Sequence, residues 1–116
     1  MRAALSAITL IVATTISQAG TLSTSLYTVI VEPRCTEGHV TCDDVKYVGL
    51  SNKSGKSITL TGKTVHTTGA DGVTPSRFMG YTFKNGDTTY FVSEGGELRV
   101  TRGSKVLVQE RGIWRW

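Results

Sequence analysis

Short runs of alternating apolar and polar residues fill the chain from position 20 onward, and glycine-rich turns separate them. Valine, threonine and aromatic residues are frequent in these runs, and none of the runs has the periodicity of an amphipathic helix. Period-two alternation of such residues is typical of strands with one buried face. The regular spacing of the turns predicts an all-β domain, a small antiparallel barrel or sandwich with a C-terminal meander.

In the first half of this domain we expect strands at 26–31, 45–50, 58–60 and 64–66. Pro33 ends the first strand, and Gly62 interrupts the alternation between the last two. The segment from Gly69 to Pro75 should be the longest loop, because its glycines and proline exclude a regular element.

The second half, from Phe78 to Val108, has the clearest pattern. Asn85-Gly86 is a strong hairpin signal, because both residues tolerate the positive φ angles of a tight turn. Further turns are expected at Gly95-Gly96 and Gly103-Ser104. We therefore expect a four-strand antiparallel meander, in which Leu98 and Val100 face the core and Arg99 and Thr101 face solvent.

Residues 1–19 have the composition of a secretory signal peptide. Met1-Arg2 is a short positive segment, an apolar run follows to Ile16, and Ser17-Gln18-Ala19 places small residues before a cleavage site. The run is shorter than the roughly 20 apolar residues that span a bilayer. We expect cleavage after about Ala19, a single mature domain at 20–116 that is periplasmic or secreted, and no transmembrane segment within it.

Cys35 and Cys42 enclose a short loop that also contains His39. In an exported protein two such cysteines predict a disulfide. The alternative is a metal site, but two thiolates and one imidazole leave a tetrahedral shell incomplete. We therefore predict the disulfide and no metal.

Without Arg2 the chain has 12 basic and 9 acidic residues, a net charge of +3. Positive residues dominate its C-terminal part, at Arg99, Arg102, Lys105, Arg111 and Arg115, against Glu110 alone. Such a segment favours anionic partners such as lipid headgroups, glycans or an acidic protein. The alternative is a solvated strand face. We do not expect a nucleic-acid partner, because the charge is modest.

No catalytic or cofactor motif is present in the sequence. It has no Gly-x-Ser-x-Gly elbow, no metal-binding histidine pair and no phosphate-binding glycine loop. Asp43 and Asp44 are adjacent, and neighbours on a strand point to opposite faces. We expect a protein that is not an enzyme and has no cofactor. A small enzyme that uses His66 is the minority hypothesis.

Candidate binding residues lie in and beside the 69–77 loop, since rigid β scaffolds often carry function on loops. Asp71 and Arg77 lie within this loop, and Phe78 and Tyr81 follow it. The spacing of Phe78 and Tyr81 places them on opposite faces of a regular strand, which leaves one of them exposed as an interaction anchor. A bulge at Gly80 would instead return both to one face.

The tail at 111–116 contains two further candidates, Trp114 and Trp116. One interpretation is that a tryptophan folds back over an open end of the barrel and stabilises it. Another is that the tail inserts at a membrane interface or into a groove of a partner. The third is a frayed terminus without a role.

Several motifs resemble the bacterial C-type lysozyme inhibitors, which are periplasmic or membrane-bound. They are Lys84-Asn85-Gly86, Tyr90-Phe91-Val92, Gly96-Glu97, Val100, Val106-Leu107-Val108, and Thr41-Cys42-Asp43-Asp44 with Leu50 downstream. The resemblance implies a small periplasmic antiparallel barrel that plugs the lysozyme cleft with a loop.

The chain departs from that family at two features. The inhibitory Ser-Gly-x-x-Tyr motif aligns with 79–83, where Met79 replaces the serine and only Gly80 and an aromatic residue, Phe83, are kept. The family bonds its first cysteine to one near the C-terminus, and this chain has none after Cys42. The resemblance therefore bears on the fold more than on the activity.

These observations favour a small exported binding or inhibitor module. It would act through its loops on a protein or glycan of the cell envelope, with lysozyme as a named candidate. The alternative is a structural or accessory envelope protein that docks through a sheet edge or its basic C-terminus. The sequence leaves the partner and the oligomeric state open.

Overall fold

The computed structural model describes residues 19–36 and 38–116, so the predicted signal peptide lies outside the described residues up to position 18. The described part is all-β, with nine strands and no helix. The strands are β1 (Gly20–Ser23), β2 (Tyr27–Pro33), β3 (Val45–Ser51), β4 (Ser57–Thr68), β5 (Pro75–Asn85), β6 (Thr88–Ser93), β7 (Glu97–Arg102), β8 (Lys105–Arg111) and β9 (Ile113–Arg115).

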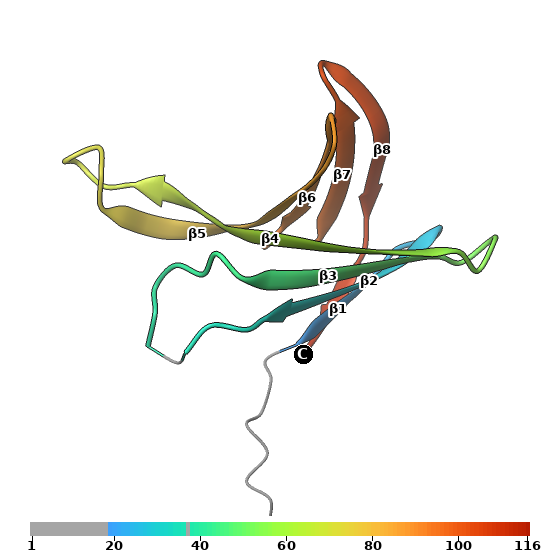
Figure 1. The fold of residues 1–116 in the computed structure, drawn as a ribbon, viewed down its shortest axis with the longest axis horizontal. Helices are drawn as coiled ribbons and strands as arrows, with labels where there is room; N and C mark the ends of the chain where they lie inside the picture. The colour runs from blue at the N-terminus through green and yellow to red at the C-terminus, as the bar shows by residue number, and fades with distance from the viewer. Residues whose placement is uncertain (1–18, 37) are drawn as a thin grey trace, which may run out of the picture.

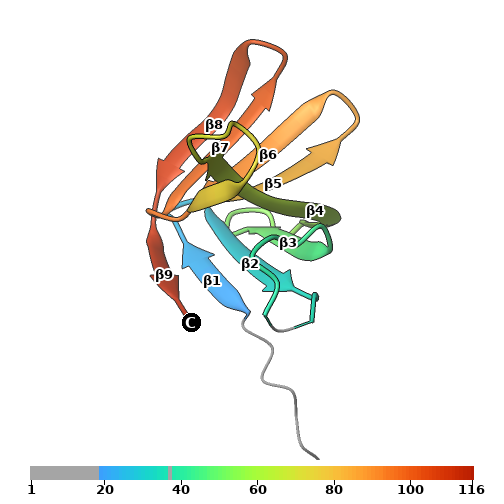
Figure 2. The same ribbon diagram turned by 90° about the vertical axis from the view of Figure 1, so that its left-hand side faces the viewer.

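All nine strands form one antiparallel sheet in the order β8-β7-β6-β5-β4-β3-β2-β1-β9. Its two outermost strands, β8 and β9, are consecutive in the chain and separated only by Gly112. The sheet therefore curls into a nearly closed barrel, with β9 beside β1 (Figures 1 and 2). Within this barrel β5 to β8 form the predicted meander. Its first turn lies one residue later than expected: Asn85 pairs with Thr88, so Gly86 and Asp87 form the turn, and only Gly86 has a positive φ.

Gly112 allows this change of partner. Its amide donates a 2.8 Å hydrogen bond to the carbonyl oxygen of Gly96, at the start of β7. On its other side a Cβ atom would lie 2.2 Å from the carbonyl oxygen of Ser23, at the end of β1. Only glycine fits between these two backbones. The chain can therefore pair with β7 along β8 and, directly after Gly112, with β1 along β9.

The core fills the inside of the barrel and follows the period-two pattern of the strands. Its fully buried members are Leu22, Val29, Val31, Val45, Phe83, Val92 and Leu98. Leu98 and Val100 are buried as predicted, and Arg99 lies on the other face with its side chain partly exposed. The alternation of the sequence therefore identified the inner face correctly.

The segments 58–60 and 64–66, expected as separate strands, form one continuous strand, β4. Gly62 does not end it. A Cβ there would lie 2.0 Å from the carbonyl oxygen of Thr82 and 2.4 Å from the ring of Phe83, on β5. Glycine is thus required for close packing against β5 rather than for a turn.

No helix of the described part is long and apolar enough to cross a membrane.

Candidate functional site

A two-stranded ribbon made of residues 63–79 projects from the barrel. β3 pairs with β4 only as far as Gly62, and β6 pairs with β5 only as far as Gly80. Beyond these points β4 and β5 continue together, without neighbours in the sheet on either side (Figure 1, left). The turn at 69–74 forms the tip of the ribbon. It is shorter than the predicted functional loop at 69–77, because residues 75–77 belong to β5, and the segment between β2 and β3 is the longer loop.

Asp71 organises the tip. Its carboxylate accepts hydrogen bonds from the amides of Val73, at 3.0 Å, and Thr74, at 2.9 Å, and a short one from the Thr74 hydroxyl. The amide of Gly69 also donates to the carbonyl oxygen of Thr74, at 2.7 Å. The Thr74 hydroxyl and then the two amides lower the pKa of Asp71 from 3.8 to about 2. The Asp71 carboxylate and this backbone hydrogen bond thus close the loop together.

Val73 lies at the end of this ordered turn and is 79% exposed. Val40, in the disulfide loop at 34–44, is 69% exposed. Both loops project from the same end of the barrel, which we call the loop end (Figure 1). Neither valine was predicted from the sequence, although Val73 is the largest apolar side chain of a turn that otherwise contains glycine, alanine, aspartate and threonine.

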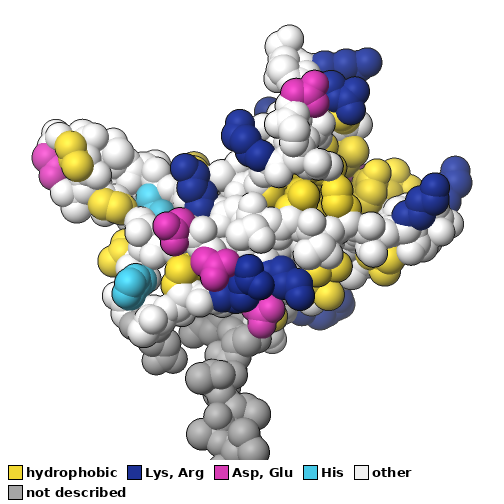
Figure 3. All heavy atoms as spheres, in the orientation of Figure 1, with side chains coloured by type: hydrophobic (Ala, Val, Ile, Leu, Met, Phe, Trp, Pro, Cys, Tyr) yellow, Lys and Arg dark blue, Asp and Glu magenta, His cyan; other side chains and the backbone are white. Residues whose placement is uncertain are grey.

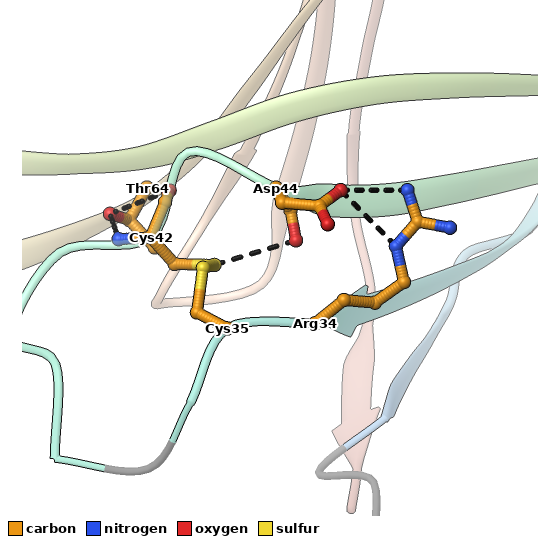
Figure 4. Close-up of a disulfide and its surroundings, with 5 residues drawn as sticks. All are labelled: Arg34, Cys35, Cys42, Asp44 and Thr64. Atoms are coloured by element: carbon orange, nitrogen blue, oxygen red, sulfur yellow. Dashed lines mark hydrogen bonds and ion pairs between the residues drawn. A yellow bond between two sulfur atoms is a disulfide. The ribbon is translucent and has the colours of Figure 1, made fainter.

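The disulfide loop is fastened to the base of the ribbon (Figure 4). The predicted bridge joins Cys35 to Cys42, and Cys42 is buried in the core. The amide of Cys42 donates to the Thr64 hydroxyl at 2.9 Å, and the amide of Thr64 donates to the carbonyl oxygen of Cys42 at 2.8 Å. Arg34 and Asp44 form an ion pair of 2.7 Å where the loop leaves and re-enters the sheet. The two loops of this end therefore share one rigid support.

A row of aromatic rings connects the ribbon to the C-terminus. Neighbouring centroids are 5.5 Å apart for His66–Phe78, 5.1 Å for Phe78–Tyr81, 6.4 Å for Tyr81–Trp114 and 4.9 Å for Trp114–Trp116. The register between β4 and β5 shifts so that Val65 faces Gly80 and His66 faces Phe78. This bulge returns Phe78 and Tyr81 to one face, so neither is an isolated surface anchor.

The C-terminal tail is an ordered strand rather than a frayed end. Trp114 pairs with Leu22 of β1, and its indole nitrogen donates a 3.1 Å hydrogen bond to the carbonyl oxygen of Ser93. Trp116 stacks on Trp114 but is 70% exposed. Trp114 thus belongs to the wall of the barrel, and Trp116 offers free apolar area beside it.

The candidate residues from the sequence divide between these features. Asp71 and Arg77 lie on the ribbon, where the Arg77 amide donates a 2.9 Å hydrogen bond to the Thr67 hydroxyl. Phe78, Tyr81, Trp114 and Trp116 form the aromatic row, and Tyr81 is buried. The structure therefore brings four of the six residues into one row and leaves Asp71 and Arg77 separate from it on the ribbon.

The described residues show no constellation suited to catalysis around His66. Its ring packs edge-on against Phe78, and no hydrogen bond joins it to an acid or a nucleophile in that part of the chain. No cluster of three or more histidine, cysteine or acidic side chains in 19–36 and 38–116 is placed to hold a metal. Because Cys35 and Cys42 are bridged, neither offers a thiolate ligand.

No family model matches this chain, and no curated protein or solved structure matches it either. Two properties distinguish the loop end, namely a tip that is held by its own hydrogen bonds and exposed apolar side chains on its two loops.

Proposed function

We propose that this protein is an exported binding module that acts through its loop end on a macromolecule of the cell envelope, in the manner of an inhibitor. The tip of the ribbon, at 69–74, enters a concave surface of the partner, and Val73 is the apolar contact at its end. The observation that carries the proposal is the exposed Val73 on a turn closed by Asp71.

Preorganisation is the physical reason for this assignment. A flexible loop loses conformational entropy when it binds, and a loop held in its bound shape avoids most of that loss. The Asp71 hydrogen bonds hold the tip, and the disulfide loop supports its base through Thr64. An apolar side chain on such a support loses little conformational entropy when a partner covers it.

Lysozyme is the named candidate partner, from the resemblance to the C-type lysozyme inhibitors. The segment aligned with their inhibitory motif, 79–83, lies within β5, and its aromatic residue Phe83 is 1% exposed. In this chain, inhibition through that segment is therefore disfavoured. The ribbon tip is the element of suitable shape, so we assign contact with a cleft to it.

An affinity experiment with a matched pair of variants tests the proposal. The exported protein serves as bait for envelope extracts, beside Val73→Asp and a control, Val106→Asp. Val106 is also an exposed valine, on β8. We expect a specific partner with the parent and the control, and loss of about tenfold or more of the affinity with Val73→Asp.

A partner held equally well by Val73→Asp would contradict the proposal. If that partner is an assembly component of the envelope whose binding depends on the C-terminal strand, the protein is an accessory protein of the envelope instead. A direct assay with purified lysozyme decides on the named candidate. If lysozyme activity is unchanged at a molar excess of this protein, lysozyme is excluded as the partner. The wider proposal of a macromolecular partner is not affected by that result.

A further inference from the structure

The end of the barrel opposite the loop end contains a cavity of about 400 Å³. Its lining includes Tyr27, Tyr47, Ile58, Tyr90, Leu98 and Val108, which come from six different strands. In Figure 3 apolar side chains fill a hollow between the β3–β4 turn and the β7–β8 hairpin. We call this opening the mouth. The volume lies within the range of small-molecule sites, roughly 300–1,000 Å³.

Tyr47 supplies a buried polar group to this apolar cavity. Its side chain is 2% exposed, and its ring centroid is 5.5 Å from that of Tyr90. Among the described residues no group forms a hydrogen bond with its hydroxyl, and the rest of its ring belongs to the apolar lining of the cavity. Burial, followed by Tyr90 and Tyr27, raises the pKa of Tyr47, so the hydroxyl stays a neutral donor.

Two basic side chains, Lys56 and Arg102, line the mouth. Lys56 lies just before β4, and Arg102 ends β7, so they approach from two different hairpins. Arg102 has one acidic neighbour, Asp87, at 3.6 Å, and that carboxylate is itself largely exposed. Lys56 has no ion-pair partner in the part of the chain that the structure describes. An anion at the mouth is therefore favoured.

We propose that the mouth is a binding site for a small amphipathic carboxylate, such as a medium-chain fatty acid. Its apolar body occupies the cavity among the tyrosine and aliphatic side chains. Its carboxylate lies between Lys56 and Arg102. This site is separate from the loop end, so its ligand and the macromolecular partner bind independently.

Calorimetry with three probes of equal chain length tests the proposed ligand class on the full chain purified from the exported fraction. The probes are dodecanoate and dodecyltrimethylammonium, both below their micellar concentrations, and dodecanol, below its solubility limit. We expect saturable one-to-one binding of dodecanoate and at least about tenfold weaker binding of the other two, because a charge-assisted contact is lost. Equal binding of dodecanoate and dodecanol, or no binding of dodecanoate, would overturn the proposal.

Variants locate the site. The double variant Lys56→Gln/Arg102→Gln should bind dodecanoate about tenfold or more weakly, while Lys53→Gln should bind as the parent does. Lys53 is an exposed residue of the same turn that does not line the cavity. These substitutions leave the core untouched, so their melting temperatures should match that of the parent.

A substitution that fills the cavity gives a second readout. Ile58→Trp should abolish dodecanoate binding in protein that retains its cooperative melting transition. Should this variant fail to fold, the polar double variant decides alone. Full dodecanoate binding by either folded variant would place the ligand elsewhere and refute the site. Val73→Asp should leave dodecanoate binding unchanged, which separates this site from the proposed function.

Discussion

The ring of Tyr47 lies over Gly49, two residues further along β3, so closely that a Cβ atom at Gly49 would be 2.7 Å from the ring and from its hydroxyl oxygen. Side chains two residues apart on a strand share a face. The absence of a side chain at Gly49 therefore lets the tyrosine lie along the strand toward the mouth. One glycine thus determines where a buried phenol points.

Gly49→Ala should displace this ring and destabilise the protein by about 1–3 kcal/mol, because overpacking forces side chains off their preferred rotamers. Chemical denaturation followed by circular dichroism measures the change. Gly95→Ala is the matched control, since its new Cβ would meet only the Ser93 hydroxyl, at 3.9 Å. Equal stability of both variants would show that Tyr47 is not held over Gly49.

Asp71→Ala should loosen the ribbon tip without unfolding the barrel. We expect the amides of Val73 and Thr74 to exchange about tenfold faster with solvent, because they lose their acceptor. Asp71→Asn, which keeps one acceptor oxygen, should lie between this variant and the parent. Hydrogen exchange followed by NMR provides the measurement, with Asp87→Asn as a control at another exposed carboxylate. Protection that is unchanged in Asp71→Ala would contradict the role of this residue.

The order of the tip should also depend on pH. The pKa of Asp71 is lowered to about 2, so its contribution is complete above the usual value of 3.8 and is lost as the pH falls toward 2. NMR spectra of the tip recorded through this range should show its resonances changing while those of the barrel core stay constant. A tip that is already disordered at pH 5 would contradict this expectation.

Stability should fall in alkaline solution because of the buried tyrosines. Burial raises the pKa of Tyr47 and of Tyr81, so the folded state favours the neutral phenols. Their contribution is complete below the pKa of an unfolded tyrosine, about 10, and is lost as the pH rises above it. Denaturant midpoints measured across this range should decline, and Tyr47→Phe should decline less steeply. A midpoint in the parent that is independent of pH there would exclude the effect.

Deletion of residues 113–116 should lower the melting temperature by roughly 5–10 °C, since it removes β9 and the packed indole of Trp114. Trp116→Ala should have a much smaller effect, because that side chain is mostly exposed. Thermal denaturation followed by circular dichroism distinguishes the two. A deletion variant that melts like the parent would mean that β9 does not close the barrel.

The sequence predicted those elements that depend on local signals. Alternation and glycine turns sufficed for β5 to β8, and cysteine spacing sufficed for the disulfide. The strand β9 was missed because it is short and its pairing partner, β1, lies far away in the sequence. The strand β1 forms a hairpin with β2 and was missed because four residues are too few to show a clear alternation. The strand propensities of individual residues do not indicate which distant segments will pair.

For the candidate sites too, features that depend on local sequence were predictable and features that depend on distant contacts were not. Asp71 and Arg77 stood out because turn residues and charges are visible in a loop. The ribbon itself was not predictable, since its projection depends on where β3 and β6 stop pairing. The cavity at the mouth was also not predictable from the sequence. Its residues Tyr27, Tyr47 and Tyr90 come from three separate strands and meet only in the curled sheet.

The junction at Gly112 has a consequence for the order of assembly. The strands β1 and β9 are direct neighbours, so this seam joins residues about 90 positions apart in the sequence. Contacts of such high sequence separation form late, because most of the chain must already be ordered before they gain anything. A chain that lacks β9 therefore holds the meander but has no strand to pair with the free edge of β1.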